Sequence, residues 1–194
     1  MNVLVTGATG FVGSCICNDL LKHNISFRRV IRRKVHNDDL VMKDISNVSD
    51  WSHALIGINI IIHAAARVHI MNDSLSDPLS EYRKVNVAGT LNLAKQAADA
   101  GIKRFVFISS IKVNGESTSH HQTFKPDYKY IPTDPYGLSK YEAEMGLVKI
   151  AEQTGMEIVI IRPPLVYGAG VKANFASLLK LVKKGYPLPF GLVN

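Results

Sequence analysis

Tyr136 and Lys140 have the side-chain types and the spacing that proton transfer requires. Side chains four positions apart lie on one face of a helix, one turn from each other. A free tyrosine has a pKa of about 10 and is a poor base at neutral pH, but a neighbouring ammonium group favours the phenolate. The pair therefore predicts a tyrosine that exchanges a proton with a substrate and whose pKa is lowered by the lysine.

A serine pair lies upstream of this helix, at the end of an apolar stretch over residues 104–109 that we expect to be a buried strand. Open α/β sheets bind their ligands at the carboxyl ends of the strands. Ser110 would then hold the same substrate oxygen that Tyr136 protonates or deprotonates. Without the other two residues, Ser109 and Ser110 would be interpreted as strand-end hydrogen bonders. With them, we predict a catalytic set of Ser110, Tyr136 and Lys140.

A glycine-rich turn near the N-terminus follows a short apolar stretch. A strand that runs directly into glycines and then into a helix leaves free backbone N–H groups at the helix N-terminus, where partial positive charge favours a phosphate. The spacing is Gly-x-x-Gly-x-x-Gly, which differs from the commoner Gly-x-Gly-x-x-Gly pattern. A tight turn without a ligand is the structural alternative. We predict that the turn binds the pyrophosphate of a dinucleotide through Gly7, Thr9, Gly10, Phe11, Val12 and Gly13.

The residues after the second expected strand indicate the type of cofactor. A carboxylate there binds the ribose 2′-hydroxyl of NAD, whereas arginine accommodates the 2′-phosphate of NADP. Arg32 and Arg33 occupy this place, and no acid occurs before Asp38. We therefore expect NADP rather than NAD. The alternative is that these arginines only form a solvated basic loop without a ligand. Asp44 and Ile45 are expected to meet the adenine amino group, although Asp44 would serve equally as a helix cap.

These features together indicate hydride transfer. A nicotinamide ring held beside a tyrosine acid or base is suited to oxidise a carbinol or to reduce a ketone. The oxidised, cationic ring would add to the effect of Lys140 in favouring the phenolate of Tyr136.

Strand-like and helix-like stretches alternate along the chain, which favours an α/β fold of the Rossmann type with a doubly wound parallel sheet. Residues 58–64 contain four isoleucines and are suited to the middle of a sheet covered on both faces. Asp77 precedes Pro78 and is expected to cap a long helix. We expect strands over residues 2–5, 25–31, 40–42, 58–64, 104–109 and 156–161. We expect helices after the glycine turn, over residues 77–100, from residue 136 onward and over residues 174–184.

Composition excludes several classes of protein. The 194 residues are 46% hydrophobic and 20% charged, which is enough to enclose one substantial core. The net charge is +7, but the Lys and Arg residues are scattered along the chain and no aromatic-rich RNA-binding motif accompanies them. We therefore expect an anionic small substrate and no nucleic acid. We expect no membrane span and a cytoplasmic protein, because the apolar runs are too short and the start lacks a cationic signal.

No metal site is expected. Cys15 and Cys17 point to different sides of a helix, which suits neither zinc nor a redox pair, so both are interpreted as small packing residues. His120 and His121 have no third ligand placed to complete a site.

Six motifs in order resemble those of the extended short-chain dehydrogenase/reductases, in the NAD-dependent epimerase/dehydratase group that acts on nucleotide sugars. The resemblance extends along essentially the whole chain. The motifs are the glycine turn, His-Ala-Ala-Ala at residues 63–66, Val-Asn-Val-Ala-Gly-Thr at residues 85–90, Ser109 with Ser110, Tyr136 with Lys140, and Arg-Pro-Pro-Leu-Val-Tyr-Gly at residues 162–168.

The resemblance implies roles for further residues. Tyr136 would be the general acid and base with Ser110 beside it, and Lys140 would also hold the nicotinamide ribose. Asn86 would have a structural role beneath the site, and Asn174 resembles the asparagine that meets the diphosphate of a UDP-linked sugar. A homodimer through the long helix and the Tyr136 helix is also implied. The residues implied to lie against the cofactor after the fourth strand are Ala64, Ala65 and Ala66.

The chain departs from the family pattern in three places. Many relatives carry Val-Tyr-Gly after the catalytic serine, whereas residues 113–115 are Val-Asn-Gly, which implies an altered sugar pocket. Ile111 and Lys112 stand where dehydratases usually have an acidic pair, which argues against 4,6-dehydration. Family members normally continue into a C-terminal substrate domain. We therefore expect a Rossmann domain over residues 1–165 and only the start of the substrate-binding region over residues 166–194, with most of that domain missing from a fragment or supplied by a partner.

Three hypotheses about function follow. The first is a reductase of a UDP-linked 4-keto sugar that uses NADPH in surface-polysaccharide precursor synthesis. Arg32 and Arg33 suit NADPH, and a reductase must exchange its cofactor after each turnover. The alternative is a 4-epimerase of the UDP-glucose/UDP-galactose type that keeps a bound NAD. The third is an NADP-binding protein without catalysis, or an inactive fragment.

Overall fold

The computed structural model describes residues 1–36, 39–68, 77–118, 122–127, 130–171 and 173–185. The chain divides into two units, residues 1–164 and residues 165–194. The first unit contains the sheet, and the second contains helix α6 (Ala173–Lys183), which was predicted over residues 174–184.

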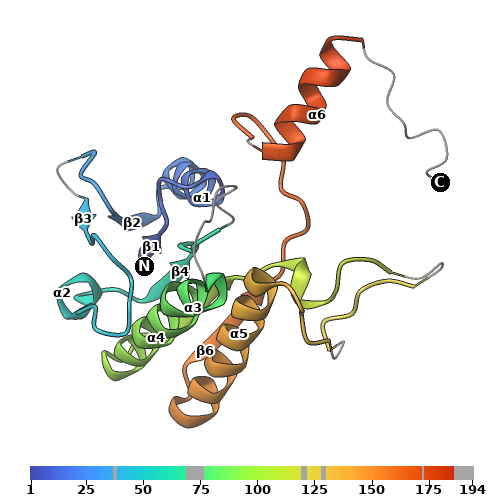
Figure 1. Ribbon diagram of the computed structural model, residues 1–194. Helices are drawn as coiled ribbons and strands as arrows, with labels where there is room; N and C mark the ends of the chain where they lie inside the picture. Colours follow the sequence, from blue (N-terminus) through green and yellow to red (C-terminus); the bar gives the residue numbers. More distant parts are fainter. Residues whose placement is uncertain (37–38, 69–76, 119–121, 128–129, 172, 186–194) are drawn as a thin grey trace. The chain divides into compact units, whose positions relative to one another are not determined.

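Six parallel strands of the described chain form one sheet in the order β3-β2-β1-β4-β5-β6 (Figure 1). The chain winds outward from β1 to β3, returns to the middle at β4 and continues to the other edge, which is the doubly wound Rossmann arrangement and confirms the expected fold class. The isoleucine-rich β4 lies between β1 and β5, as predicted. Predicted and observed strand ends differ by at most two residues. The strands are β1 (Asn2–Thr6), β2 (Ser26–Ile31), β3 (Leu40–Val41), β4 (Ile60–His63), β5 (Arg104–Ile108) and β6 (Glu157–Ile161).

The long helix expected over residues 77–100 is three segments in succession, of which the middle one is a π-helix. The Asp77 carboxylate accepts a hydrogen bond of 3.1 Å from the backbone N–H of Ser80, which confirms the predicted cap. The π-helix and two short helices were not predicted. Among the described residues, no helix is both long and apolar enough to cross a membrane. The helical segments of the first unit are α1 (Phe11–Lys22), α2 (Ser52–Leu55), α3 (Pro78–Tyr82), η1 (Arg83–Gly89), α4 (Thr90–Asp99), η2 (Ile111–Val113) and α5 (Pro135–Thr154).

Alternate residues of β1 point to opposite faces of the sheet and enter two separate cores. Val5 packs on one face with Cys17 of α1. Leu4 packs on the other face in the core that contains Leu147 of α5. Helices therefore cover both faces, with α1 on one side and α4 and α5 on the other (Figure 1). Cys15 is exposed, so the expectation that both cysteines are packing residues is wrong for this one, because it lies on the outer side of α1.

His63 ends β4 and is buried among the central elements. Its Nδ1 atom lies 2.7 Å from Oγ1 of Thr6 at the end of β1, and its Nε2 atom lies 3.0 Å from Oγ1 of Thr90 at the start of α4. The imidazole thus joins the two middle strands to the helix that covers them. Burial, with a smaller contribution from the charge of Lys140, lowers the pKa of His63 to about 3.

This pKa predicts a loss of stability at mildly acidic pH. The pKa of His63 is about 3 in the folded chain and 6.5 in the ordinary, unfolded state, so the unfolded chain binds a proton first as the pH falls below 6.5. We expect the free energy of unfolding to drop by roughly 2 kcal/mol between about pH 7 and pH 5 from this group alone. Denaturant titrations across this range measure the slope.

The variant His63→Asn should lose this part of the slope, whereas His53→Asn, which removes an exposed imidazole on α2, should keep it. Equal slopes in the wild type and in both variants would contradict the prediction.

Candidate active site

The glycine turn packs against the segment that follows β4. Gly7 has a φ of +67°, and a Cβ atom there would lie 2.6 Å from the backbone nitrogen of Ala65. A Cβ atom on Gly13 would lie 2.1 Å from the carbonyl oxygen of Gly7, so α1 sits directly on the turn. Glycine is therefore required at both positions by the protein's own backbone. The structure brings together two predicted cofactor segments, the turn and the alanines that begin at Ala64.

The start of α1 has the properties of a phosphate site. Gly10 is the N-cap in an extended conformation, no side chain caps the helix, and its first turn carries no acidic residue. Thr9, Gly10 and Phe11 are exposed, whereas Val12 is half-buried. The first N–H groups of a helix have no partner within the helix and carry partial positive charge. These residues fit a phosphate-bearing cofactor.

The end of β2 presents two exposed arginines, Arg32 and Arg33. The acid nearest to them in the described chain, Asp39, turns inward: its carboxylate pairs with Arg29 at 2.6 Å and accepts from the N–H groups of Val35 at 3.0 Å and His36 at 2.6 Å. Burial acts to raise the pKa of Asp39, but these donors outweigh burial and lower it. Asp39 thus organises the turn after β2. Asp38, the first acidic residue after the arginines in the sequence, lies outside the described residues.

The loop that contains Asp44 and Ile45 is fastened to α4. Asn92 donates to the carbonyls of Ser46 at 3.0 Å and Ser49 at 2.8 Å. A Cβ atom on Gly89 would lie 2.7 Å from Cγ2 of Ile45, so the π-helix and the loop are in close contact. Asp44 accepts from the N–H of its neighbour Ile45 at 2.9 Å and caps no described helix. Sequence reasoning missed this fastening because it joins residues about 45 positions apart.

Helix α5 begins at Pro135, one residue before the predicted start, with Asp134 as its cap. The Asp134 carboxylate accepts from the N–H of Gly137 at 2.9 Å. One turn further, Lys140 is buried, its Nζ atom donates to the carbonyl of Ile108 at 2.8 Å, and it lies 4.5 Å from the centre of the Phe107 ring. The ring of Tyr136 lies edge-on to Tyr82, with centroids 6.0 Å apart. The lysine therefore attaches the tyrosine helix to the carboxyl end of β5.

The two side chains have opposite pKa shifts. Burial lowers the pKa of Lys140 to about 7, and the nearby charge of Glu144 acts in the other direction. Burial, then the charge of Asp134 and the effect of Tyr82, raise the pKa of Tyr136 to about 12. The expectation that Lys140 lowers the pKa of the tyrosine is therefore wrong for this arrangement, because the ammonium group is directed to the Ile108 carbonyl and burial dominates.

The two serines after β5 differ in their surroundings. Ser109 is buried, and its hydroxyl donates a short hydrogen bond to the carboxylate of Glu144 on α5. Ser110 is half-buried, and its Oγ atom accepts from the N–H of Lys112 at 3.3 Å, which caps η2. Ser110 is thus the serine outside the buried network. Its place two residues after Ile108 puts it beside the strand carbonyl that Lys140 contacts.

Asn86 connects the segment after β4 to α5. Its Oδ1 atom accepts from the N–H of Arg67 at 2.8 Å, and its Nδ2 atom donates to the Arg67 carbonyl at 3.0 Å and to Oγ of Ser139 at 3.0 Å. Ser139 in turn donates to the carbonyl of Tyr136 at 2.7 Å. These contacts are structural ones beneath Tyr136. Arg67, which they position, follows Ala66 directly.

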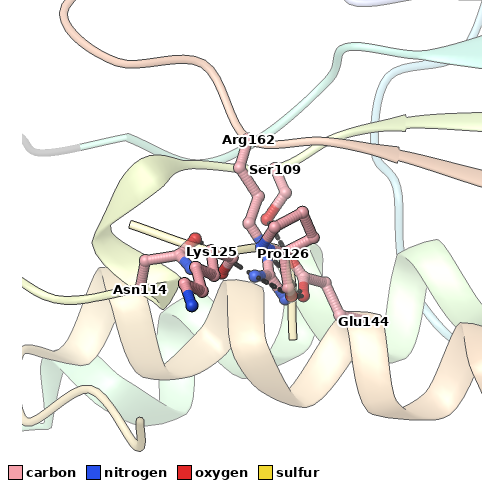
Figure 2. A network of polar contacts seen from close by, with 6 residues as sticks. All are labelled: Ser109, Asn114, Lys125, Pro126, Glu144 and Arg162. Carbon is pink, nitrogen blue, oxygen red and sulfur yellow. Dashed lines mark hydrogen bonds and ion pairs between the residues drawn. The ribbon is translucent and has the colours of Figure 1, made fainter. Parts of the chain in front are cut away.

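An ion pair between a buried carboxylate and a half-buried guanidinium group lies next to this site and was missed by sequence reasoning. Glu144, one turn after Lys140, pairs with Arg162 at the end of β6 (Figure 2). The spacing of four residues between Lys140 and Glu144 was a usable signal, because it places the carboxylate on the same face of α5. The arginine partner could not be read from spacing.

Other residues named in the sequence analysis lie in the second unit or outside the described residues. Asn174 lies in α6 of the second unit, and its side chain is outside the described part of the structure. His120 and His121 are also outside it. Within the described ranges, no group of three His, Cys, Asp or Glu side chains is arranged to hold a metal ion.

The sequence model of the "NAD dependent epimerase/dehydratase family" matches residues 3–187. The chain belongs to this family. It is 50% identical over 196 residues to the UDP-glucose 4-epimerase of Vibrio cholerae, an alignment that covers 99% of this chain and 60% of that protein.

Two solved structures of the family share the fold. The UDP-glucuronic acid 4-epimerase from Bacillus cereus in complex with NAD gives a TM-score of 0.81 at 25% identity, over 97% of this chain and 64% of that one. The Thermus thermophilus UDP-glucose 4-epimerase in complex with NAD gives 0.80 at 26% identity, over 97% and 64%. The chain thus spans about three fifths of the length of the relatives it matches.

Because Lys140 is buried, we predict that it lowers the free energy of unfolding of the chain. Its pKa is about 7 in the folded chain and 10.5 in the ordinary state, so the unfolded chain holds the proton more tightly and the cost grows as the pH falls from 10.5 to 7, then stays constant. We expect Lys140→Met to melt at a higher temperature than the wild type at pH 7 and below. The lost hydrogen bond to Ile108 offsets part of this gain.

Thermal melts between about pH 6 and pH 10 test this expectation, and the advantage of Lys140→Met should shrink as the pH rises. Lys149→Met, which removes an exposed lysine of the same helix, is the matched control and should change little. A lower melting temperature for Lys140→Met at every pH would refute the prediction.

Proposed function

We propose that this chain forms the cofactor-binding and proton-transfer part of a UDP-sugar 4-epimerase that uses NAD. The observation that carries the proposal is the hydrogen bond of 2.8 Å from Lys140 to the Ile108 carbonyl. This bond attaches the helix of Tyr136 to the carboxyl end of β5, next to Ser110. Ligands of doubly wound sheets bind at this edge, and the turn at Gly7 lies at the same edge, after β1, which is separated from β5 by β4.

The proposed cofactor residues follow from the contacts of the two predicted segments. The exposed residues Thr9, Gly10 and Phe11 at the start of α1 would lie against the pyrophosphate, with Gly7, Val12 and Gly13 shaping the turn. Ala64, Ala65 and Ala66 would lie along the cofactor, since Ala65 already contacts the turn. Asp44 and Ile45 would meet the adenine. Lys140 would hold the nicotinamide ribose.

In the proposed reaction, Tyr136 takes the proton of the sugar 4-hydroxyl as the carbinol becomes a ketone, and returns it when the carbinol is formed again with opposite configuration. Ser110 hydrogen-bonds the same oxygen and keeps it in line with the phenol. Bound oxidised nicotinamide supplies the hydride acceptor and a positive charge that favours the phenolate. Because burial raises the pKa of Tyr136, formation of the phenolate would depend on this positive charge.

The relationship to epimerases supports this reaction over the reductase that the sequence first favoured. The reductase hypothesis and its preference for NADP rest on Arg32 and Arg33, which are exposed and suited to a 2′-phosphate. The relative from Vibrio cholerae is 50% identical, and it is a UDP-glucose 4-epimerase. NADPH-dependent reduction of a 4-keto sugar therefore remains the second candidate.

Three earlier expectations remain predictions within this proposal. Residues 166–194 would begin the substrate-binding region, Asn174 would contact the substrate diphosphate, and the chain would form a homodimer.

Replacing the phenol tests the proposed chemistry. We expect Tyr136→Phe to slow the reduction of NAD by UDP-glucose or UDP-galactose by about a hundredfold or more, because the hydroxyl proton loses its acceptor. The measurement is the near-ultraviolet absorbance of reduced nicotinamide in a single turnover, with NAD affinity measured separately by calorimetry.

Tyr141→Phe removes a phenol one residue after Lys140 on the same helix and is the control, which should keep the wild-type rate. Equal rates in Tyr136→Phe and the wild type would favour a protein that binds the cofactor without catalysis.

The choice of cofactor has its own test. If the exposed arginines recognise a 2′-phosphate, the double variant Arg32→Ala/Arg33→Ala should bind NADP about tenfold or more weakly and NAD almost unchanged. For a 4-epimerase with NAD, we expect the wild type to bind NAD more tightly than NADP by calorimetry. The reverse order, lost in the double variant, would support the reductase instead.

A further inference from the structure

One buried carboxylate is hydrogen-bonded to two strand ends next to the proposed catalytic residues. Glu144 is 3% exposed and lies on α5, one turn after Lys140. Its Oε1 atom accepts the hydroxyl of Ser109, and both of its oxygens accept from Arg162, with distances of 2.6 Å from Nη2 to Oε2 and 3.1 Å from Nε to Oε1 (Figure 2). The parallel fork is the geometry in which an arginine holds a carboxylate most rigidly.

Backbone hydrogen bonds on both sides of Ser110 link the chain after β5 to β6 and its continuation. The N–H of Ser109 donates to the carbonyl of Ile161 at 2.7 Å, and the N–H of Ile111 donates to the carbonyl of Pro163 at 3.1 Å. Ser110 lies between these two bonds. Since Glu144 holds the side chains of Ser109 and Arg162, it sets the position of this two-strand platform relative to α5.

Arg162 extends the same network to the loop that precedes α5. Its Nη1 atom donates to Oδ1 of Asn114 at 3.1 Å and to the carbonyl of Pro126 at 3.0 Å, and Asn114 donates to the carbonyl of Lys125 at 2.7 Å (Figure 2). Asn114 lines a cavity of about 310 Å³ together with Phe124 and others from this loop. One guanidinium group thus contacts the helix of Tyr136 and the wall of this cavity.

The pair is poorly explained as a device for stability. Glu144 is buried and Arg162 is half-buried, and an ion pair withdrawn from water often contributes no more stability than apolar side chains of the same volume, because desolvation offsets the attraction. The pair instead fixes the orientation of Arg162 relative to Glu144, because the forked hydrogen bonds join two planar groups. The carboxylate also acts on Lys140, where its charge opposes the effect of burial on the pKa.

We propose that Glu144 and Arg162 are positioning residues that hold Ser110 in line with Tyr136 and Lys140 and couple this alignment to the loop around Asn114. The proposal rests on the proposed function for its kinetic test, but its structural test does not. Neither residue is proposed to touch the substrate or the cofactor.

The variant Glu144→Gln keeps the size of the side chain, removes its charge and replaces one accepting oxygen with a donating NH2 group. We expect the single-turnover reduction of NAD by a UDP-hexose to slow by about tenfold or more, since small misalignment of reacting groups has large effects on rate. The Kd of NAD should change less than about twofold, because the glycine turn is untouched. Glu142→Gln, on the same helix in an exposed pair with Arg83, is the matched control and should keep the wild-type rate.

A readout without substrate or cofactor separates this proposal from the proposed function. In nuclear magnetic resonance spectra of the chain, Glu144→Gln should shift the amide signal of Ser110 and lower the titration midpoint of the Lys140 side chain, whereas Glu142→Gln should change neither. If the wild type transfers no hydride, the proposed function fails and these signals alone decide the positioning role.

Arg162→Lys is the second variant and serves if Glu144→Gln fails to fold, because it keeps the charge and loses the fork together with the Nη1 contacts to Asn114 and Pro126. It should shift the Ser110 amide and slow the reaction while NAD still binds. Unchanged Ser110 and Lys140 signals in a folded variant would overturn the proposal. A loss of rate that is accompanied by comparably large losses of NAD affinity and of thermal stability would also overturn it, because that combination indicates a general structural effect.

Discussion

The buried ammonium group of Lys140 is the interaction on which the arrangement of the site depends. Removing a charged amine from water is unfavourable, and its lowered pKa reflects that cost. The carbonyl of Ile108 and the face of the Phe107 ring partly compensate. Both groups belong to β5, so the compensation is available only when α5 lies against the carboxyl end of that strand. The lysine therefore favours one position of the tyrosine helix, with its N-terminal part at the end of β5.

Around this lysine, polar side chains form a buried layer above the apolar core. His63 joins β1, β4 and α4, Asn86 joins the segment after β4 to α5, and Glu144 joins α5 to the ends of β5 and β6. Buried polar groups are tolerated when they are hydrogen-bonded, and such bonds are directional. The apolar side chains below, such as Leu93, Phe105 and Leu147, hold the layers together without specifying orientation. The polar layer supplies that orientation at the edge where a ligand of this fold binds.

Much of the fold was predictable because its signals are local. The caps at Asp77 and Asp134, the glycine turn and the apolar strands involve residues within a few positions of each other, so their structures follow from short-range sterics and hydrogen bonding. The segment after Tyr82 was predicted as ordinary α-helix but is a π-helix. Its Gly89 lies against Ile45, a contact across more than forty residues that no local pattern carries.

By itself, the sequence determined the order of strands and helices, the helix caps, and the placement of Tyr136, Lys140 and Glu144 on one face of a helix, because periodicity and capping act over a few residues. Only the tertiary structure decided which serine is engaged by Glu144, where the ammonium of Lys140 points, and that the pKa of Tyr136 is raised rather than lowered. These outcomes depend on burial and on partners from distant strands. The free energy of a charge is set by everything that surrounds it in space, and spacing along the chain does not contain that information.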